Sequence, residues 1–128
     1  MDILGGMKMI NHQEFLFQVK VVKRLSKSGI PCFSVPNHLL KNGVAEGKRE
    51  ISAGLRKGAP DLIAGIDGKS FWFELKTPTG HQSEEQKAFQ QISGKFGATY
   101  VVLKSIEQLE SIINGTTDNF KTSPTTTR

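Results

Sequence analysis

The chain has 128 residues, enough for one domain with its own core, and its single cysteine, Cys32, excludes an internal disulfide or a multi-cysteine zinc site. No apolar run approaches the roughly 18 residues of a membrane span and the N-terminus lacks a signal-peptide pattern, so we expect a cytoplasmic protein without membrane contact. The net charge is +5, and residues 1–58 hold ten Lys/Arg against four Asp/Glu, a balance that favours nucleic acid as partner but also fits a solvated surface.

Residues 1–10 are too short to fold alone and are expected to form a loose leader. The next segment, 11–28, has the apolar spacing of a helix and ends at Gly29. Asn11 can cap this helix, and Glu14 lies three residues further on, at the position of a capping-box acid. The segment 30–36 is predicted to be a first strand bounded by prolines.

The segment 37–57 has no regular pattern and is long for a loop in a small domain, which favours a binding role or disorder. Its basic residues can contact the phosphates of nucleic acid, or they can lie on a solvated insertion. We expect contact with DNA, because this loop leads directly into the next strand; the residues concerned are Lys48, Arg49, Arg56 and Lys57.

A β-hairpin is predicted over residues 61–76, with Asp67-Gly68 at the turn because this pair supplies the positive φ angles of a tight hairpin. This turn fixes the register and sets Asp61 opposite Glu74, with Lys76 on the same face. The alternate face carries Phe71, Phe73 and Leu75 and is expected to enter the core.

Two neighbouring carboxylates repel each other unless a positive group lies between them, and they suit Mg²⁺, which is often held by one or two carboxylates plus water and phosphate oxygens. A lysine beside such a metal can activate water or stabilise the charge of the transition state. Asp61, Glu74 and Lys76 therefore indicate metal-assisted hydrolysis of a phosphodiester. The alternative is a surface ion cluster in which Lys76 only neutralises the two acids.

Residues 83–96 are predicted to form a helix, since Ser83-Glu84-Glu85-Gln86 matches a capping box. Lys87 either reaches a phosphate or is simply solvated. A buried strand over 99–103 and a helix over 105–114 follow, and the Ser/Thr-rich residues 115–128 are expected to be a disordered tail. The order helix, strand, strand, strand, helix, strand, helix predicts an α/β domain over residues 11–114 with a mixed sheet flanked by helices.

These residues also carry a resemblance. Pro60-Asp61 followed by Glu74-Leu75-Lys76 resembles the PD-(D/E)xK nuclease motif. The glycine-rich lead before Asp61, the Thr-Pro-Thr-Gly turn at 77–80 and the downstream Gln86 are similar to the VRR-NUC branch of that superfamily, as found in stand-alone phage proteins. The likeness extends from about His12 to Ile113, most of the chain.

The resemblance implies a restriction-endonuclease-like core and a nuclease that depends on Mg²⁺, with Mn²⁺ as a substitute. It implies that Asp61 and Glu74 bind the metal together with the backbone carbonyl of Leu75. In this family a glutamate of the first helix faces the metal, a place taken here by Glu14, which would act directly or through water and could also merely cap its helix. Lys76 would position or activate water. Gln86 would orient the nucleophile or Lys76, although the capping box already explains its presence.

The resemblance further implies a deoxyribonuclease of replication, repair or recombination, often encoded by bacteriophages and then acting in the host cytoplasm. Some relatives cut branched DNA such as four-way junctions, and stand-alone members are expected to form homodimers. A structure-selective endonuclease is therefore the expected function. The alternative is a DNA-binding module that has kept the nuclease fold without cleaving DNA.

Overall fold

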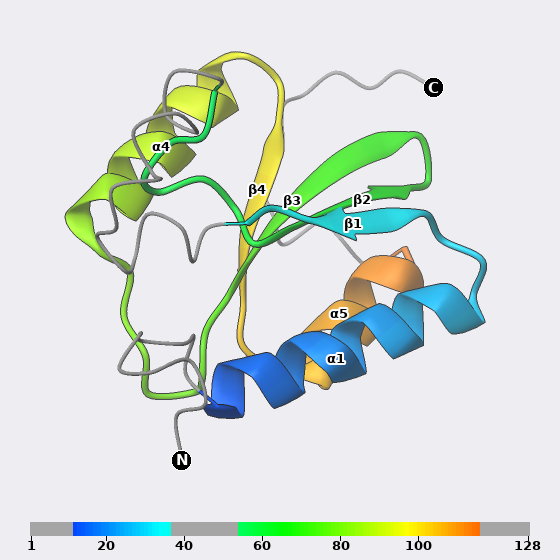
Figure 1. The fold of residues 1–128 in the computed structure, drawn as a ribbon. Helices are drawn as coiled ribbons and strands as arrows, with labels where there is room; N and C mark the ends of the chain where they lie inside the picture. Colours follow the sequence, from blue (N-terminus) through cyan, green and yellow to red (C-terminus); the bar gives the residue numbers. More distant parts are fainter. Residues whose placement is uncertain (1–11, 37–53, 116–128) are drawn as a thin grey trace.

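The computed structural model describes residues 12–36 and 54–115. Figure 1 shows an α/β arrangement in the predicted order, and each helix begins and ends beside the predicted residue. The elements are α1 (His12–Lys27), β1 (Cys32–Ser34), β2 (Leu62–Ile66), β3 (Lys69–Leu75), α4 (Glu84–Lys95), β4 (Thr99–Leu103) and α5 (Ile106–Ile113). The predicted leader, the residues Lys48 and Arg49, and all of the predicted tail except Gly115 lie outside the described residues.

The four strands form one mixed sheet in the order β1-β2-β3-β4, which confirms the predicted class of sheet. The pairs β1·β2 and β2·β3 are antiparallel, whereas β3 and β4 are parallel. Parallel neighbours need a crossover, and α4 is the helix of that crossover. Strand β1 is shorter than predicted and spans only three residues next to Pro31, which has no N–H to donate to a ladder.

The hairpin of β2 and β3 has the predicted register, with Ile66 opposite Lys69 and Ala64 opposite Phe71. Its two turn residues both have positive φ, 54° at Asp67 and 78° at Gly68. This is the backbone of a tight turn whose twist matches that of the strands, and Asp-Gly favours it because neither residue is strongly penalised there. The turn thus fixes which side chains of β3 share a face.

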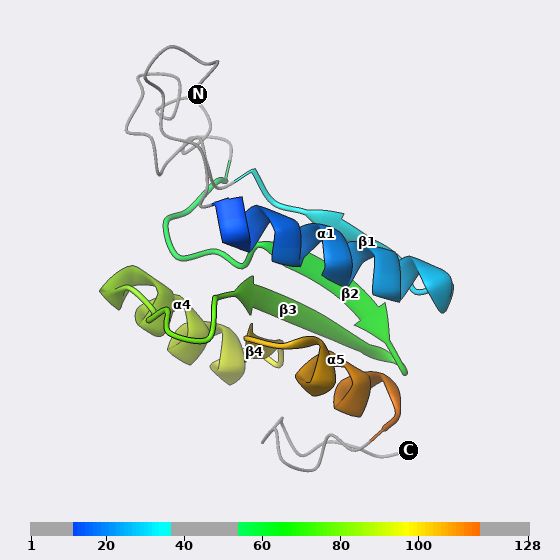
Figure 2. The ribbon, with the colours of Figure 1, turned by 90° about the horizontal axis from the view of Figure 1, so that it is seen from below.

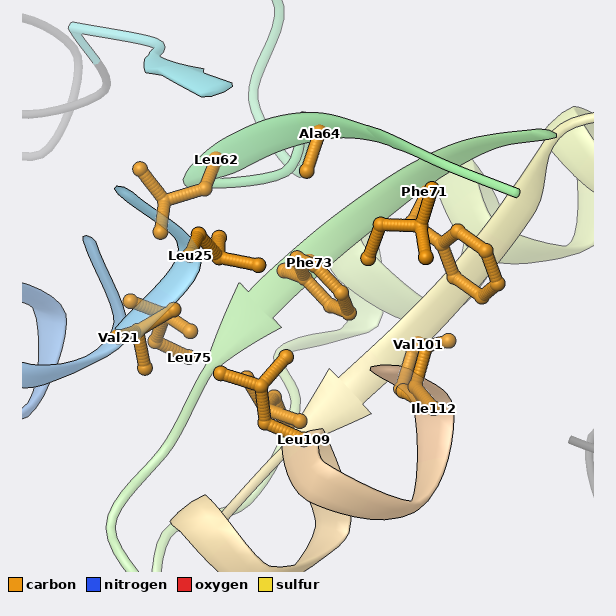
Figure 3. Packing of buried hydrophobic residues seen from close by; sticks show 12 residues of the cluster. Val21, Leu25, Leu62, Ala64, Phe71, Phe73, Leu75, Val101, Leu109 and Ile112 are labelled. Carbon is orange, nitrogen blue, oxygen red and sulfur yellow. The ribbon is translucent and has the colours of Figure 1, made fainter. Parts of the chain in front are cut away.

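One face of the sheet packs against α1 and α5 and forms the hydrophobic core (Figure 3). The side chains of Phe73, Leu25 and Leu109 are fully buried there. Phe71 and Phe73 stack with their ring centroids 5.8 Å apart. The alternation of β3 is therefore as predicted, with its aromatic and aliphatic face in the core.

The opposite face is covered by α4, as Figures 1 and 2 show. Aromatic contacts join them: Trp72 of β3 lies 6.1 Å from Phe89 of α4 between ring centroids, and Phe89 lies 6.3 Å from Tyr100 of β4. Both views also place the first turn of α1 at the end of the molecule where β3 ends. Among the described helices, none is long and apolar enough to cross a membrane.

Candidate active site

A charged side chain, Glu74, is buried near the end of β3. It lies on the α4 face together with Trp72, and its residue pairs with Val102 of β4. Its exposed fraction is only 1%. Because burial of a carboxylate is costly unless it is paired, this position needs an explanation beyond surface charge. Glu74 therefore does not lie on an exposed sheet face, although its pairing with Lys76, the other part of the ion-cluster alternative, is present.

One oxygen of Glu74 is held by Tyr100. The Tyr100 hydroxyl lies 2.5 Å from Glu74 Oε1 and 3.1 Å from the carbonyl oxygen of Gly58. The hydroxyl has a single proton, so it donates to one of these acceptors at a time or shares the proton between them. Burial and the neighbouring Glu74 charge raise the pKa of Tyr100, which keeps the phenol protonated as a donor.

The other oxygen of Glu74 faces Lys76. Lys76 Nζ lies 3.4 Å from Glu74 Oε2, and the lysine side chain is 14% exposed. The contact is an ion pair that lacks hydrogen-bond alignment, so Oε2 is a buried oxygen without a hydrogen-bond partner among the described residues. A buried acceptor in this condition is rare in a folded protein and suits a further donor, a water molecule or a cation.

The surroundings of Glu74 disfavour its charge. Burial is the largest cause and raises its pKa, and the charge of Asp61 raises it further. The Tyr100 hydroxyl and Lys76 lower the pKa of Glu74, but by less than burial and Asp61 together raise it. A cation next to Oε2 would reverse this balance, because an opposite charge at close range favours the ionised carboxylate.

Asp61 is fixed at the end of the hairpin by its backbone and its side chain. Its N–H donates to the carbonyl of Phe73 at 2.8 Å, and its Oδ2 accepts the N–H of Leu75, also at 2.8 Å. Asp61 is half-buried. The structure therefore brings Asp61 and Glu74 into one electrostatic environment, as the hairpin register predicts. The backbone N–H of Leu75 is a donor to Asp61. The proposal that the Leu75 carbonyl is a metal ligand stays a prediction.

The loop before Asp61 rests on the first turn of α4. Gly58 has φ +89°, and a Cβ atom at this position would lie 2.4 Å from the backbone oxygen of Glu85. Only glycine allows this approach. The same residue accepts the Tyr100 hydrogen bond. Gly58 therefore connects the Asp61 loop, α4 and the Tyr100–Glu74 pair.

Gln86 forms the predicted capping box. Its Oε1 accepts the N–H of Ser83 at 2.7 Å, and its own N–H donates to Ser83 Oγ at 3.1 Å. The side chain is buried, with 8% exposed. The capping role of Gln86 is confirmed, and its hydrogen bond uses the carbonyl oxygen of the side-chain amide. The orienting role toward Lys76 or a nucleophile stays a prediction.

The donor set fits a hard divalent cation. No group of three or more His, Cys, Asp or Glu side chains suited to a metal occurs within residues 12–36 and 54–115. Mg²⁺, however, is often held by one or two carboxylates with water and phosphate oxygens completing the shell. Asp61 and Glu74 supply that number, and Glu74 Oε2, which accepts no hydrogen bond from the described residues, supplies an oxygen for it. Glu14 is half-buried in the first turn of α1, and its share in such a shell stays a prediction.

The predicted DNA-binding residues that the structure describes are Arg56, Lys57 and Lys87, and all three are exposed. Arg56 and Lys57 line a largely apolar groove of about 750 Å³ that is also lined by Trp72 and Phe89. Trp72 packs on Phe89, which agrees with a packing role for this tryptophan.

Tyr100 is the main site residue that sequence reasoning missed. The one signal was a phenol hydroxyl in a strand that is apolar after Thr99. Comparison with known proteins adds no assignment, since no family model, curated protein or solved structure matches this chain.

Proposed function

We propose that this protein is a metal-dependent deoxyribonuclease that hydrolyses phosphodiester bonds with Mg²⁺ or Mn²⁺. The observation that carries the proposal is the buried Glu74, whose Oε2 has no hydrogen-bond partner among the described residues while Asp61 and Lys76 lie beside it. A purely structural carboxylate would be expected to have both oxygens satisfied. A carboxylate reserved for a cation would not.

The chain's own residues have separate tasks in this proposal. Asp61 and Glu74 hold the cation, and the Leu75 N–H keeps Asp61 in place through Oδ2. Tyr100 fixes the Glu74 carboxylate through Oε1, so that Oε2 points away from this hydrogen bond. Lys76 orients the attacking water or takes its proton, and it stabilises negative charge on the phosphate. The bound cation would act as a Lewis acid on the phosphate oxygen.

The wider features of this proposal rest on the resemblance in the sequence. The mixed sheet with α4 as crossover is compatible with a restriction-endonuclease-like core, which we propose as its fold. We also propose branched DNA as substrate, a homodimer that could act on two strands, and action in the cytoplasm. Glu14 and Gln86 keep their proposed roles as a further acid and an orienting amide.

The test is a cleavage assay with labelled single-stranded, duplex, flap and four-way-junction DNA in Mg²⁺ or Mn²⁺. Lys76→Ala should lower the cleavage rate by at least about a hundredfold, as for loss of a general acid–base group. Lys69→Ala, an exposed lysine in the hairpin, is the matched control and should cleave like the wild type. Equal cleavage by Lys76→Ala and Lys69→Ala would contradict the proposed role of Lys76.

A second candidate function is DNA binding without cleavage. The observation that favours it is the ion pair between Lys76 and Glu74, which gives the buried carboxylate a positive partner within the chain. In that case the protein would bind DNA, and no substrate would be cut with either metal. The same assay therefore separates the two functions.

A further inference from the structure

A polar pocket of about 470 Å³ lies beside the Glu74 site, where β3 and β4 end. Its lining includes Gly80 after β3, Val102 at the end of β4, and Lys104 directly after β4. Val102 is the register partner of Glu74. A Cβ atom on Gly80 would lie 3.4 Å from Cδ of Lys76, so the Lys76 side chain lies next to a residue that lines this pocket.

Two lysines give the lining of this pocket its charge. Its ionisable lining residues are His81, Lys87 and Lys104, and no carboxylate belongs to the lining. Within the part of the chain that the structure describes, Lys104 and His81 form no ion pair, and Lys87 has only an exposed contact of 3.4 Å with Glu84. Exposed pairs of this kind contribute little, so Lys87 can turn to another anion.

The backbone around Lys104 is held in place. Gln108 accepts the N–H of Lys104 at 2.9 Å through Oε1 and donates to the carbonyl of Val102 at 3.0 Å through Nε2. The N–H of Lys76 donates to the carbonyl of Leu103 at 3.0 Å, which sets Lys76 and Lys104 side by side at the ends of parallel strands. Two lysines thus follow the ends of neighbouring strands, and among the described residues Glu74 pairs with only one of them, Lys76.

We infer that this pocket binds a backbone phosphate of the nucleic acid whose neighbouring phosphodiester reaches Glu74 and Lys76. This inference rests on the proposed function and adds the path of the strand. Lys104, His81 and Lys87 contact the phosphate next to the scissile bond. The strand thus leaves the site past the carboxyl ends of β3 and β4. Lys104 and His81 are binding residues that the sequence motif does not include.

Binding is tested separately from cleavage, by fluorescence anisotropy of a labelled DNA duplex in EDTA and again in Ca²⁺. Lys104→Gln should weaken binding by roughly five- to tenfold near 0.1 M salt, and the slope of log K against log salt should become shallower by about 0.9, the value for one lost phosphate contact. Lys69→Gln removes the same charge from the hairpin turn, at the other end of β3, and should leave that slope nearly unchanged.

Equal effects of Lys104→Gln and Lys69→Gln would overturn this inference, because they would show a response to net charge alone. Absence of DNA binding by the wild type in both EDTA and Ca²⁺ would also overturn it. Failure of the nuclease proposal looks different: DNA would remain uncut with Mg²⁺ and Mn²⁺ while binding still depended on Lys104. In that case the pocket would be the DNA-binding site of a non-cleaving protein.

Discussion

A buried carboxylate is the residue on which the site depends. Burial raises the pKa of Glu74, so the folded protein retains this proton at pH values where the unfolded chain has lost it. The resulting stabilisation is fully present below the ordinary glutamate pKa of 4.5 and is lost as pH rises through the folded-state pKa. The carboxylate is therefore a liability at neutral pH unless a cation compensates it.

We expect Glu74→Gln to become more stable relative to the wild type as pH rises above 4.5 in metal-free buffer. Each unit of raised pKa contributes about 1.4 kcal/mol to this difference. The measurement is urea unfolding of both proteins over a pH series, and taking the difference cancels groups such as Glu110 whose pKa is lowered by Arg24. A difference that does not change with pH would contradict the direction of the Glu74 shift.

The relative positions of site residues that are close in sequence, or opposite each other in the hairpin, could be predicted. The two-residue turn sets Asp61 near Glu74, and the alternation of β3 sets Lys76 on the same face. The Tyr100 contact was not predictable, because it joins residues 26 apart through the parallel register of β3 and β4. Nothing local in the sequence fixes such a register, whereas a tight turn fixes an antiparallel one.

At the scale of elements, the loop before Asp61 depends on its contact with α4. Gly58→Ala would place a methyl group against the backbone of Glu85, so either the loop or the helix must move. Gly97→Ala is the matched control, because φ is +90° there and no atom lies within 4 Å of the added Cβ. Both variants carry the conformational penalty of positive φ, about 1–2 kcal/mol, and only Gly58→Ala adds the clash.

Gly58→Ala should therefore lower the free energy of unfolding by about 2 kcal/mol more than Gly97→Ala does. Chemical denaturation of both variants measures the difference. Because Gly58 also accepts the Tyr100 hydrogen bond, Gly58→Ala should slow DNA cleavage as well. Equal losses of stability in the two variants would show that the loop does not dock on α4 as described.

The boundaries of the helices were predictable for local reasons. Ser83 and Gln86 each accept the backbone N–H of the other at the start of α4. Gly97, which has positive φ, follows the end of α4. The docking of the 54–60 loop on α4 was not predictable, because it depends on a close approach between backbones that are distant in sequence. A glycine-rich lead before Asp61 indicated only that the backbone would be unusual.

At the scale of the whole molecule, the sheet separates two environments. The face toward α1 and α5 is apolar and fully packed, with Phe73 and Leu109 inaccessible to solvent. The face toward α4 is aromatic along Trp72 and Phe89, then charged at Glu74 and Lys76 where β3 ends. The alternation of apolar and polar residues along β3 predicted this division. The position of α4 on the second face follows from the crossover between β3 and β4, which the sequence pattern alone does not specify.

The proposed cation site lies in a basic protein. The chain has a net charge of +5, and cations line both the groove at Arg56 and Lys57 and the pocket at Lys104. Asp61 and Glu74 are the two acids of the proposed metal site. The arrangement suits a polyanion that crosses the site while a metal ion is held by the two acids.

The most direct test of this account is calorimetric titration of Mn²⁺ into the wild type, Glu74→Gln and the control Glu107→Gln, an exposed acid of the first turn of α5. The wild type and the control should bind Mn²⁺ equally. Glu74→Gln should bind Mn²⁺ at least about tenfold more weakly, because the loss of a residue that only supports a metal ligand already lowers affinity by about tenfold or more. Circular dichroism would verify that all three are folded. Binding by Glu74→Gln as tight as by the wild type, or no binding by the wild type, would contradict the claim that Oε2 of Glu74 receives a divalent cation.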